Sequence, residues 1–308
     1  MSKMSNMWMG LGALFVANFI GGAFNSVLIK LGVREIPPIT FTMLRFFLAT
    51  IVILPFYLKE HNKGLIRKNI WSIVAQSIFF ATNVGIFSVA VQFTSAIMSQ
   101  VLYLFIPIIV GVLSYFIFKE RFTKDKIIGS LLALLGVFLL LEGSIVKADI
   151  LSLGTLYGNL LIILGAFVFS GYLLFSQKLT KIYSPVTTSF FTFAITFILL
   201  AAIVPFELMV RPLQLDKITA LGIGSLLFIA IFSSAIAYFL IQLGIKKTGA
   251  FTASLFQYIG PFFTAISAMI VLGEKITLPV VLGGLLIISG VFYATTWQYI
   301  KKSMKLQK

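Results

Sequence analysis

Long apolar runs recur along almost the whole chain and constrain the fold more than any other feature. A helix that spans a bilayer needs about 20 mostly apolar residues. Runs of this kind cover residues 7–30, 38–58, 70–92, 95–118, 127–141, 154–176, 186–206, 218–244, 250–272 and 279–299. The connections between them are too short for a soluble domain. The sequence therefore predicts an all-α polytopic membrane protein with ten transmembrane helices.

The composition excludes several other classes of protein. Of the 308 residues, 59% are hydrophobic and 11% are charged, whereas a soluble domain has about 25% charged residues. Cysteine is absent and His61 is the single histidine, which leaves few side chains for a metal site. The apolar runs contain no Asp, Glu or His, and no GxxxxGK[ST] loop occurs. We therefore expect no catalytic residues, no metal, no cofactor and no direct use of ATP.

The basic residues predict how the chain crosses the membrane. If the N-terminus is cytoplasmic, 17 of the 24 Lys and Arg residues lie in cytoplasmic segments, 6 lie on the other side and Arg45 lies within a span. Such a bias over short loops sets the orientation of membrane proteins. It predicts that both termini are cytoplasmic, which fits an even number of spans. Because the bases are spread over many loops, they do not indicate binding of nucleic acid.

The chain also resembles itself at an offset of 154 residues. Thr94, Pro107, Gly129 and Gly136 align without a gap with Thr248, Pro261, Gly283 and Gly290, respectively. This repeat predicts two units of five helices, residues 1–145 and 150–300, with the first apolar run retained as a helix rather than cleaved as a signal peptide. Because five is odd, the second unit must be inverted. Inverted repeats are typical of secondary transporters, with a site near the midplane; duplication for structure alone is the alternative.

These segments resemble the EamA repeats of the drug/metabolite transporter superfamily. The resemblance rests on Thr94–Ala96, Pro107, Lys119–Glu120 and Gly129–Gly136 and on their counterparts around Thr248–Ala250, Pro261, Leu272–Gly273–Glu274 and Gly283–Gly290. It implies ten helices around a central cavity and movement of small metabolites, often outward. One departure is Lys119, which stands where the second repeat has Gly273.

Polar side chains that share helical faces are the candidate substrate-binding residues. Amides and hydroxyls are unfavourable in hydrocarbon unless they are paired or wetted, so they should point inward, either into a cavity or toward a neighbouring helix. The candidates are Asn18, Asn25, Asn83, Gln100, Tyr103, Ser234, Tyr238, Gln257 and Tyr258. The same faces carry Pro107 and Pro261, which should kink their helices and act either as gating hinges or as static kinks.

Arg45 is the one charged residue inside a predicted span. It lies seven residues after Pro38, about 10 Å below the outer surface at 1.5 Å per residue. No carboxylate is available in the apolar core to pair with it. Arg45 could extend to the interface, contact polar groups, or bind an anionic group of a substrate.

Together these features predict a secondary transporter that moves amino acids or similar zwitterionic or anionic solutes by alternating access; export is implied by the resemblance. The alternatives are a multidrug exporter of the same fold and a non-transporting regulator or lipid-handling protein. The expected partners are a small solute and membrane lipid, in a monomer or homodimer. The expected location is the bacterial cytoplasmic membrane.

Overall fold

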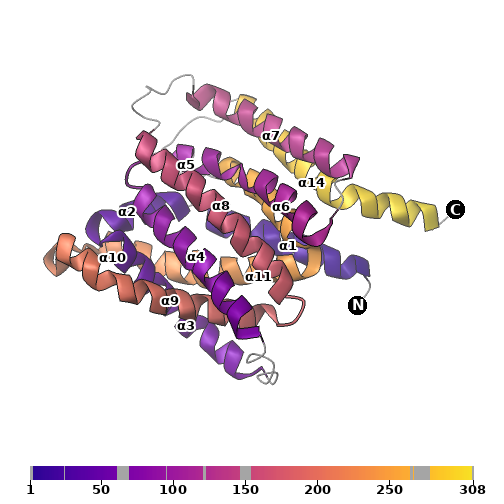
Figure 1. Cartoon of the computed structure of the whole chain (residues 1–308). Coiled ribbons are helices and arrows are strands. Elements are labelled where there is room, and N and C mark those ends of the chain that lie inside the picture. The colour runs from indigo at the N-terminus through magenta and orange to yellow at the C-terminus, as the bar shows by residue number, and fades with distance from the viewer. Residues whose placement is uncertain are drawn as a thin grey trace.

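The computed structural model describes residues 3–23, 25–60, 69–94, 96–120, 123–145, 154–263, 266 and 278–306, and in these ranges it contains helices and no strand (Figure 1). The first half consists of α1 (Lys3–Ala23), α2 (Asn25–Glu35), α3 (Pro38–Leu58), α4 (Ile70–Ala90), α5 (Ala96–Tyr103), α6 (Ile106–Phe118) and α7 (Lys124–Ile145). The second half consists of α8 (Leu156–Leu179), α9 (Pro185–Val210), η3 (Leu215–Lys217), α10 (Ala220–Phe228), η4 (Ile229–Ile236), α11 (Ala237–Thr248), α12 (Ala250–Leu255), η5 (Phe256–Ile259) and α14 (Leu278–Leu306).

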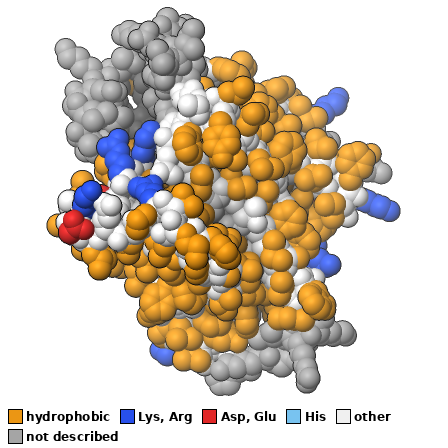
Figure 2. Space-filling view, turned by 60° about the vertical axis from the view of Figure 1, so that its left-hand side comes forward, with side chains coloured by type: hydrophobic (Ala, Val, Ile, Leu, Met, Phe, Trp, Pro, Cys, Tyr) orange, Lys and Arg blue, Asp and Glu red, His pale blue; other side chains and the backbone are white. Residues whose placement is uncertain are grey.

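Several helical stretches in the described ranges are long and apolar enough to cross a membrane. There are six, namely Pro38–Leu58, Ile70–Ala90, Met98–Phe118, Leu156–Leu179, Pro185–Val210 and Ala220–Thr248. Large apolar side chains such as Phe116, Phe138 and Phe206 are exposed, and apolar atoms cover most of the face seen in Figure 2. A bilayer can solvate such a surface, so the predicted all-α polytopic fold is confirmed. The number of ten spans and the cytoplasmic termini stay predictions, and Leu272–Gly273–Glu274 lies outside the described residues.

The most extensive helix packing joins helices from different halves of the chain. α7 packs along α14, α3 along α9, α4 along α8, and α1 along α11, and the first of these pairs is visible at the top of Figure 1. The two sequence repeats therefore interleave in space. Each of these eight helices packs against a partner that lies far away in the sequence.

Glycines allow α7 and α14 to approach closely. A Cβ atom on Gly129 would lie 2.5 Å from the carbonyl oxygen of Gly290, and one on Gly136 would lie 2.6 Å from that of Gly283. No side chain fits at such distances, which is the usual reason for small residues between membrane helices.

Carboxylates fasten α3 and α9 to each other at both ends. At the end where α3 begins, Glu207 accepts hydrogen bonds of 2.7 Å from the backbone nitrogens of Ile39 and Thr40. At the other end, Glu60 accepts hydrogen bonds from the hydroxyls of Ser184 (2.6 Å) and Thr187 (2.5 Å), at the start of α9. Glu207, near the end of α9, thus accepts hydrogen bonds from the first turn of α3. Glu60, just after the end of α3, does the same for the first turn of α9.

The two ends of the bundle can be named from these contacts. We call the end where α3, α8 and α11 finish the basic face, because Lys59, Lys178, Lys246 and Lys247 lie there. A hydrogen bond of 3.1 Å from Lys246 to the carbonyl of Tyr183 joins α11 to the segment between α8 and α9 at this end. The positive-inside bias predicts that the basic face is cytoplasmic.

Candidate functional site

Two helices are interrupted at matching positions near the centre of the bundle. The first, α5, ends at Tyr103, and α6 begins at Ile106 with Pro107 in its first turn. In the second repeat α12 gives way to the 3-10 helix η5, which ends at Ile259, two residues before Pro261. A proline has no N–H for the carbonyl four residues earlier, and those residues are Tyr103 and Gln257. The predicted kinks are therefore present, and each places a cavity-lining residue at the interruption.

A third irregularity lies in the long helix that runs from α10 to α11. Its middle, η4, is a π-helix that contains Ser233 and Ser234. Short π-helical segments often occur at functional sites, because the wider turn redirects the side chains it carries. Here Ser233 faces a cavity, whereas Ser234 accepts a hydrogen bond from the side chain of Arg45.

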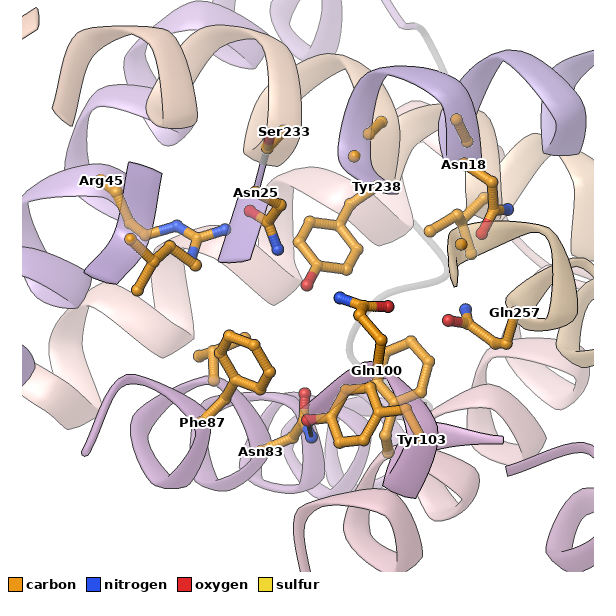
Figure 3. A pocket seen from close by; sticks show the side chains of 18 residues that line it. Asn18, Asn25, Arg45, Asn83, Phe87, Gln100, Tyr103, Ser233, Tyr238 and Gln257 are labelled. Atoms are coloured by element: carbon orange, nitrogen blue, oxygen red, sulfur yellow. Dashed lines mark hydrogen bonds between the residues drawn. The ribbon is translucent and has the colours of Figure 1, made fainter. Parts of the chain in front are cut away.

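The irregular helices surround a cavity of about 90 Å³ (Figure 3). Eight of the ten predicted substrate-binding residues line it, namely Asn18, Asn25, Arg45, Asn83, Gln100, Tyr103, Tyr238 and Gln257. They come from α1, α2, α3, α4, α5, α11 and η5. The cavity therefore collects polar side chains from both repeats, as the shared helical faces predict.

Four predicted residues do not line the cavity. Ser234 lies behind Arg45 and holds it, and Tyr258 is 1% exposed and belongs to the hydrophobic core. Both Gln257 and Tyr258 are candidates from the sequence, and of these two residues of η5 only Gln257 lines the cavity. The hinge candidates Pro107 and Pro261 are buried next to it, in the turns that follow Tyr103 and Gln257.

Arg45 brings a positive charge to one end of the cavity. Its side chain is 2% exposed, and its Nε donates a hydrogen bond of 2.9 Å to the hydroxyl of Ser234. In Figure 3 the guanidinium extends toward Asn25. Among the described residues that line the cavity there is no Asp or Glu. The site is therefore neutral to positive, as the sequence predicts.

Some of the polar side chains are fixed by their neighbours. The amide nitrogen of Asn83 donates to the hydroxyl of Tyr103 at 2.8 Å and to the carbonyl of Gly165 at 2.9 Å. The amide nitrogen of Asn18 donates to the carbonyl of Leu14 in its own helix at 2.9 Å. These hydrogen bonds hold the amide groups of Asn83 and Asn18 in place before a solute binds.

Three other polar atoms of the cavity residues are buried and lack a hydrogen-bond partner within the described part of the chain. They are Nη2 of Arg45, Oδ1 of Asn25 and the hydroxyl oxygen of Ser233. A buried polar atom without a partner destabilises the fold by about 1–3 kcal/mol. In a functional cavity, such atoms are the ones that a ligand or water can satisfy.

Sequence reasoning missed several lining residues. Ser233 adjoins Ser234 on the same polar stretch of the sequence, but only Ser234 was a candidate, and the π-helix directs Ser233 instead to the cavity. Phe87 and Phe169 also line the cavity, and both read as ordinary core residues in an apolar run; the one available signal is that Phe87 lies one turn after Asn83. Among the described residues no cluster of His, Asp or Glu could hold a metal ion.

Comparisons with known proteins place this architecture in a family. The sequence profile of the EamA-like transporter family matches residues 8–142 and 156–296. The uncharacterized transporter YyaM of Bacillus subtilis is 30% identical over 282 residues, with 90% of each chain covered. An uncharacterized transporter of Archaeoglobus fulgidus is 28% identical over 280 residues, covering 89% of this chain and 94% of its own.

A solved crystal structure has the same fold. It superposes with a TM-score of 0.71 at 16% sequence identity and covers 96% of this chain and 99% of its own. The two matched segments of the family profile correspond to the two sequence repeats, and the apolar surface identifies an integral, multi-pass membrane protein. The chain belongs to the EamA-like transporter family and is a membrane transporter of the drug/metabolite type.

Proposed function

We propose that the protein exports small zwitterionic metabolites, amino acids first among them, across the bacterial cytoplasmic membrane. The observation that carries this proposal is the set of three unpartnered polar atoms in one cavity, on Arg45, Asn25 and Ser233. The outward direction is supported by the resemblance to the family alone.

The three atoms offer complementary chemistry. Nη2 of Arg45 is a charged donor, and planar guanidinium groups suit carboxylates. The hydroxyl of Ser233 can donate a second hydrogen bond to the same carboxylate, and Oδ1 of Asn25 can accept one from an ammonium group. An α-amino acid carries both groups on one carbon, so a single small solute could satisfy the set.

The size of the cavity favours a small solute over a drug. Pockets that enclose drug-sized ligands measure roughly 300–1,000 Å³, and this cavity measures about 90 Å³. Aromatic residues such as Phe87, Tyr103 and Tyr238 supply part of its wall and suit the apolar side chain of an amino acid as well as a drug. The multidrug exporter remains the competing function.

Alternating access would use the matched interruptions at Pro107 and Pro261 as gates. Because helices of the two halves interleave, and because α3 and α9 are fastened at both ends, we favour bending of α5–α6 and α12–η5 over separation of the halves. A hinge of a few residues can absorb such a change.

The test is transport in proteoliposomes with three labelled solutes of matched shape. One is an apolar amino acid such as leucine, the second is the amine that lacks its carboxylate, and the third is the acid that lacks its ammonium group. We expect counterflow of the amino acid, at most weak counterflow of the acid, and none of the amine. Each measurement is made with and without a pH gradient, which reports coupling to protons.

Two results would contradict the proposal. Equal counterflow of the amine would remove the role of the carboxylate and of Arg45. Protection of cells against a panel of toxic compounds, with no flux of any amino acid, would favour the multidrug exporter.

A further inference from the structure

A second group of polar side chains lies buried between the cavity and the basic face. We call Gln76, Ser176, Thr192 and Gln242 the inner polar cluster. Each is 0% exposed, and they come from α4, α8, α9 and α11. They do not line the cavity of Figure 3, and the binding chemistry described above does not use them.

Hydrogen bonds connect the members of the inner polar cluster. The amide nitrogen of Gln76 donates to the hydroxyl of Ser176 at 2.7 Å, and that of Gln242 donates to the same hydroxyl at 3.2 Å. Gln242 also donates to the hydroxyl of Tyr172 at 2.8 Å. The hydroxyl of Thr192 donates to the carbonyl of Thr188 in its own helix at 2.7 Å and lies 3.4 Å from the amide oxygen of Gln76. Four helices thus meet through side-chain polar groups at one depth.

The cluster continues the polar faces that form the cavity. On α4, Gln76 precedes the cavity residue Asn83 by seven residues, about 10 Å closer to the basic face. On α11, Gln242 follows the cavity residue Tyr238 by four residues, which places it on the same side of the helix. The same faces that carry solute-binding groups therefore extend toward the basic face.

Aromatic rings separate the cluster from the cavity. The ring of Phe80 lies 4.7 Å from that of Tyr172 and 4.7 Å from that of Tyr238, centroid to centroid. Phe46 lies 5.2 Å from Phe80, and Phe193 lies 5.8 Å from Phe46. We call these five rings the aromatic barrier. On α4, Phe80 stands between Gln76 and Asn83, so the barrier interrupts a face that is polar on both sides of it.

Holding four helices together does not fully explain why the residues of the inner polar cluster are polar. Oε1 of Gln242 is buried and has no hydrogen-bond partner in the described part of the chain. Apolar side chains of similar size would join the four helices without leaving a buried acceptor unsatisfied. The unpaired Oε1 of Gln242 is explained if water or solute reaches it in another conformation of the protein.

We infer that the inner polar cluster is a second solute-contacting site on the basic-face half of the transport path, closed in this conformation by the aromatic barrier. This inference rests on the proposed function only in that the chain moves a solute. The free acceptor on Gln242 and the hydroxyls of Ser176 and Thr192 suit a small polar solute with an ammonium or other donor group. The solute would pass between this site and the cavity when the rings separate.

The natural absence of cysteine allows a direct test. Ser176→Cys introduces a single thiol into the cluster. Ser77→Cys is the matched control, because Ser77 is also 0% exposed and adjoins Gln76 but bonds to Ile73 of its own helix at 2.8 Å. A membrane-impermeant thiol reagent is applied to sealed vesicles with the basic face outward, with leucine present on both sides and without it.

We expect Ser176→Cys to react at least about tenfold faster than Ser77→Cys, since an open minor state exposes the first thiol and not the second. Gln242→Cys should behave like Ser176→Cys, which protects the test against one poorly folded variant. Equal rates for Ser176→Cys, Gln242→Cys and Ser77→Cys, in vesicles whose protein transports solute, would overturn the inference. Faster reaction of the cluster thiols from the opposite face would overturn it as well.

The same experiment distinguishes failure of the proposed function from failure of the inferred second site. If the cysteine-free parent carries no amino acid while Ser176→Cys still reacts faster than Ser77→Cys, the substrate assignment is wrong and the path stands. If the parent carries leucine and the three thiols react alike, the path is wrong and the substrate assignment stands.

Discussion

The described parts of the fourth and ninth apolar runs are interrupted at matching places, although they present different side chains to the cavity. Both are interrupted just before a proline, between α5 and α6 in the first repeat and at η5 in the second. At the interruption the first repeat offers Gln100 and Tyr103, whereas the second offers Gln257 and the bare backbone of Gly260. The repeat therefore preserves where the backbone bends, and the chemistry differs between its two copies.

The third and eighth runs differ even in their backbone. α4 is an α-helix from Ile70 to Ala90, whereas its counterpart contains the π-helix η4. The second and seventh runs differ in charge, because Arg45 follows Pro38 by seven residues and Thr192 follows Pro185 by the same number. Two similar halves thus build a polarised cavity, with its charge contributed by the first repeat and its π-helix by the second.

Removing the charge that distinguishes the first repeat should have the largest effect. Arg45→Gln should lower amino acid counterflow about 100-fold, since the loss of a buried charged partner amounts to about 2–5 kcal/mol. The buried guanidinium has no carboxylate partner among the residues that the structure describes, so the variant should be at least as stable as the parent by thermal unfolding. Arg34→Gln, which removes an exposed charge outside the cavity, is the control. Normal counterflow by Arg45→Gln would show that the polarity of the cavity is unimportant.

Removing the features that the repeats share should have the next largest effect. Pro107→Ala and Pro261→Ala should each restore a backbone hydrogen bond and lower the transport rate on the order of tenfold, with solute affinity almost unchanged. Binding measured by calorimetry and flux measured in liposomes separate the two quantities. If the prolines are static kinks, neither variant will slow transport; if one slows it alone, the two interruptions are mechanically unequal.

The two asparagines of the first repeat should differ from each other. Asn25→Leu removes an acceptor without a partner and should weaken binding of an amino acid about tenfold. Asn18→Leu should weaken it less than about threefold, because the amide of Asn18 already bonds to Leu14. Dissociation constants for leucine measure both changes. The reverse order would mean that the solute approaches the wall near Asn18.

The smallest effects should come from replacing Glu207 and Glu60, the carboxylates that join α3 of the first repeat to α9 of the second. Glu207→Gln and Glu60→Gln should each lower the free energy of unfolding by about 1 kcal/mol, because a charged acceptor at a helix start becomes neutral. Unfolding in denaturant measures the loss, and transport at moderate temperature should persist. A transport defect in one variant alone would identify that end of the α3–α9 pair as a moving gate.

Most of the fold could be predicted from the sequence because membrane helices leave strong local signals. Six of the predicted apolar runs agree within a few residues with the long apolar helices of the structure. Pro107 and Pro261 indicated the two interruptions. Eight of the ten residues predicted to bind substrate line the cavity, and their role in binding stays a prediction. Ser234 and Tyr258 do not line the cavity, because a π-turn and a 3-10 turn alter the angle between successive side chains. Pro261 indicates the 3-10 turn, whereas nothing in the sequence around Ser234 marks the π-turn.

The sequence by itself determined that the chain lies in a membrane, that it repeats, and that Arg45 is the charge within a span. These follow from hydrophobicity and period, which act locally along the chain. Only the tertiary structure decided that the repeats interleave, that Arg45 bonds to Ser234, and that Nη2, Oδ1 and a serine hydroxyl are left unpartnered in one cavity. The physical reason is that helix pairing depends on close packing between surfaces far apart in the sequence, and whether a buried polar atom is satisfied depends on what that packing brings next to it.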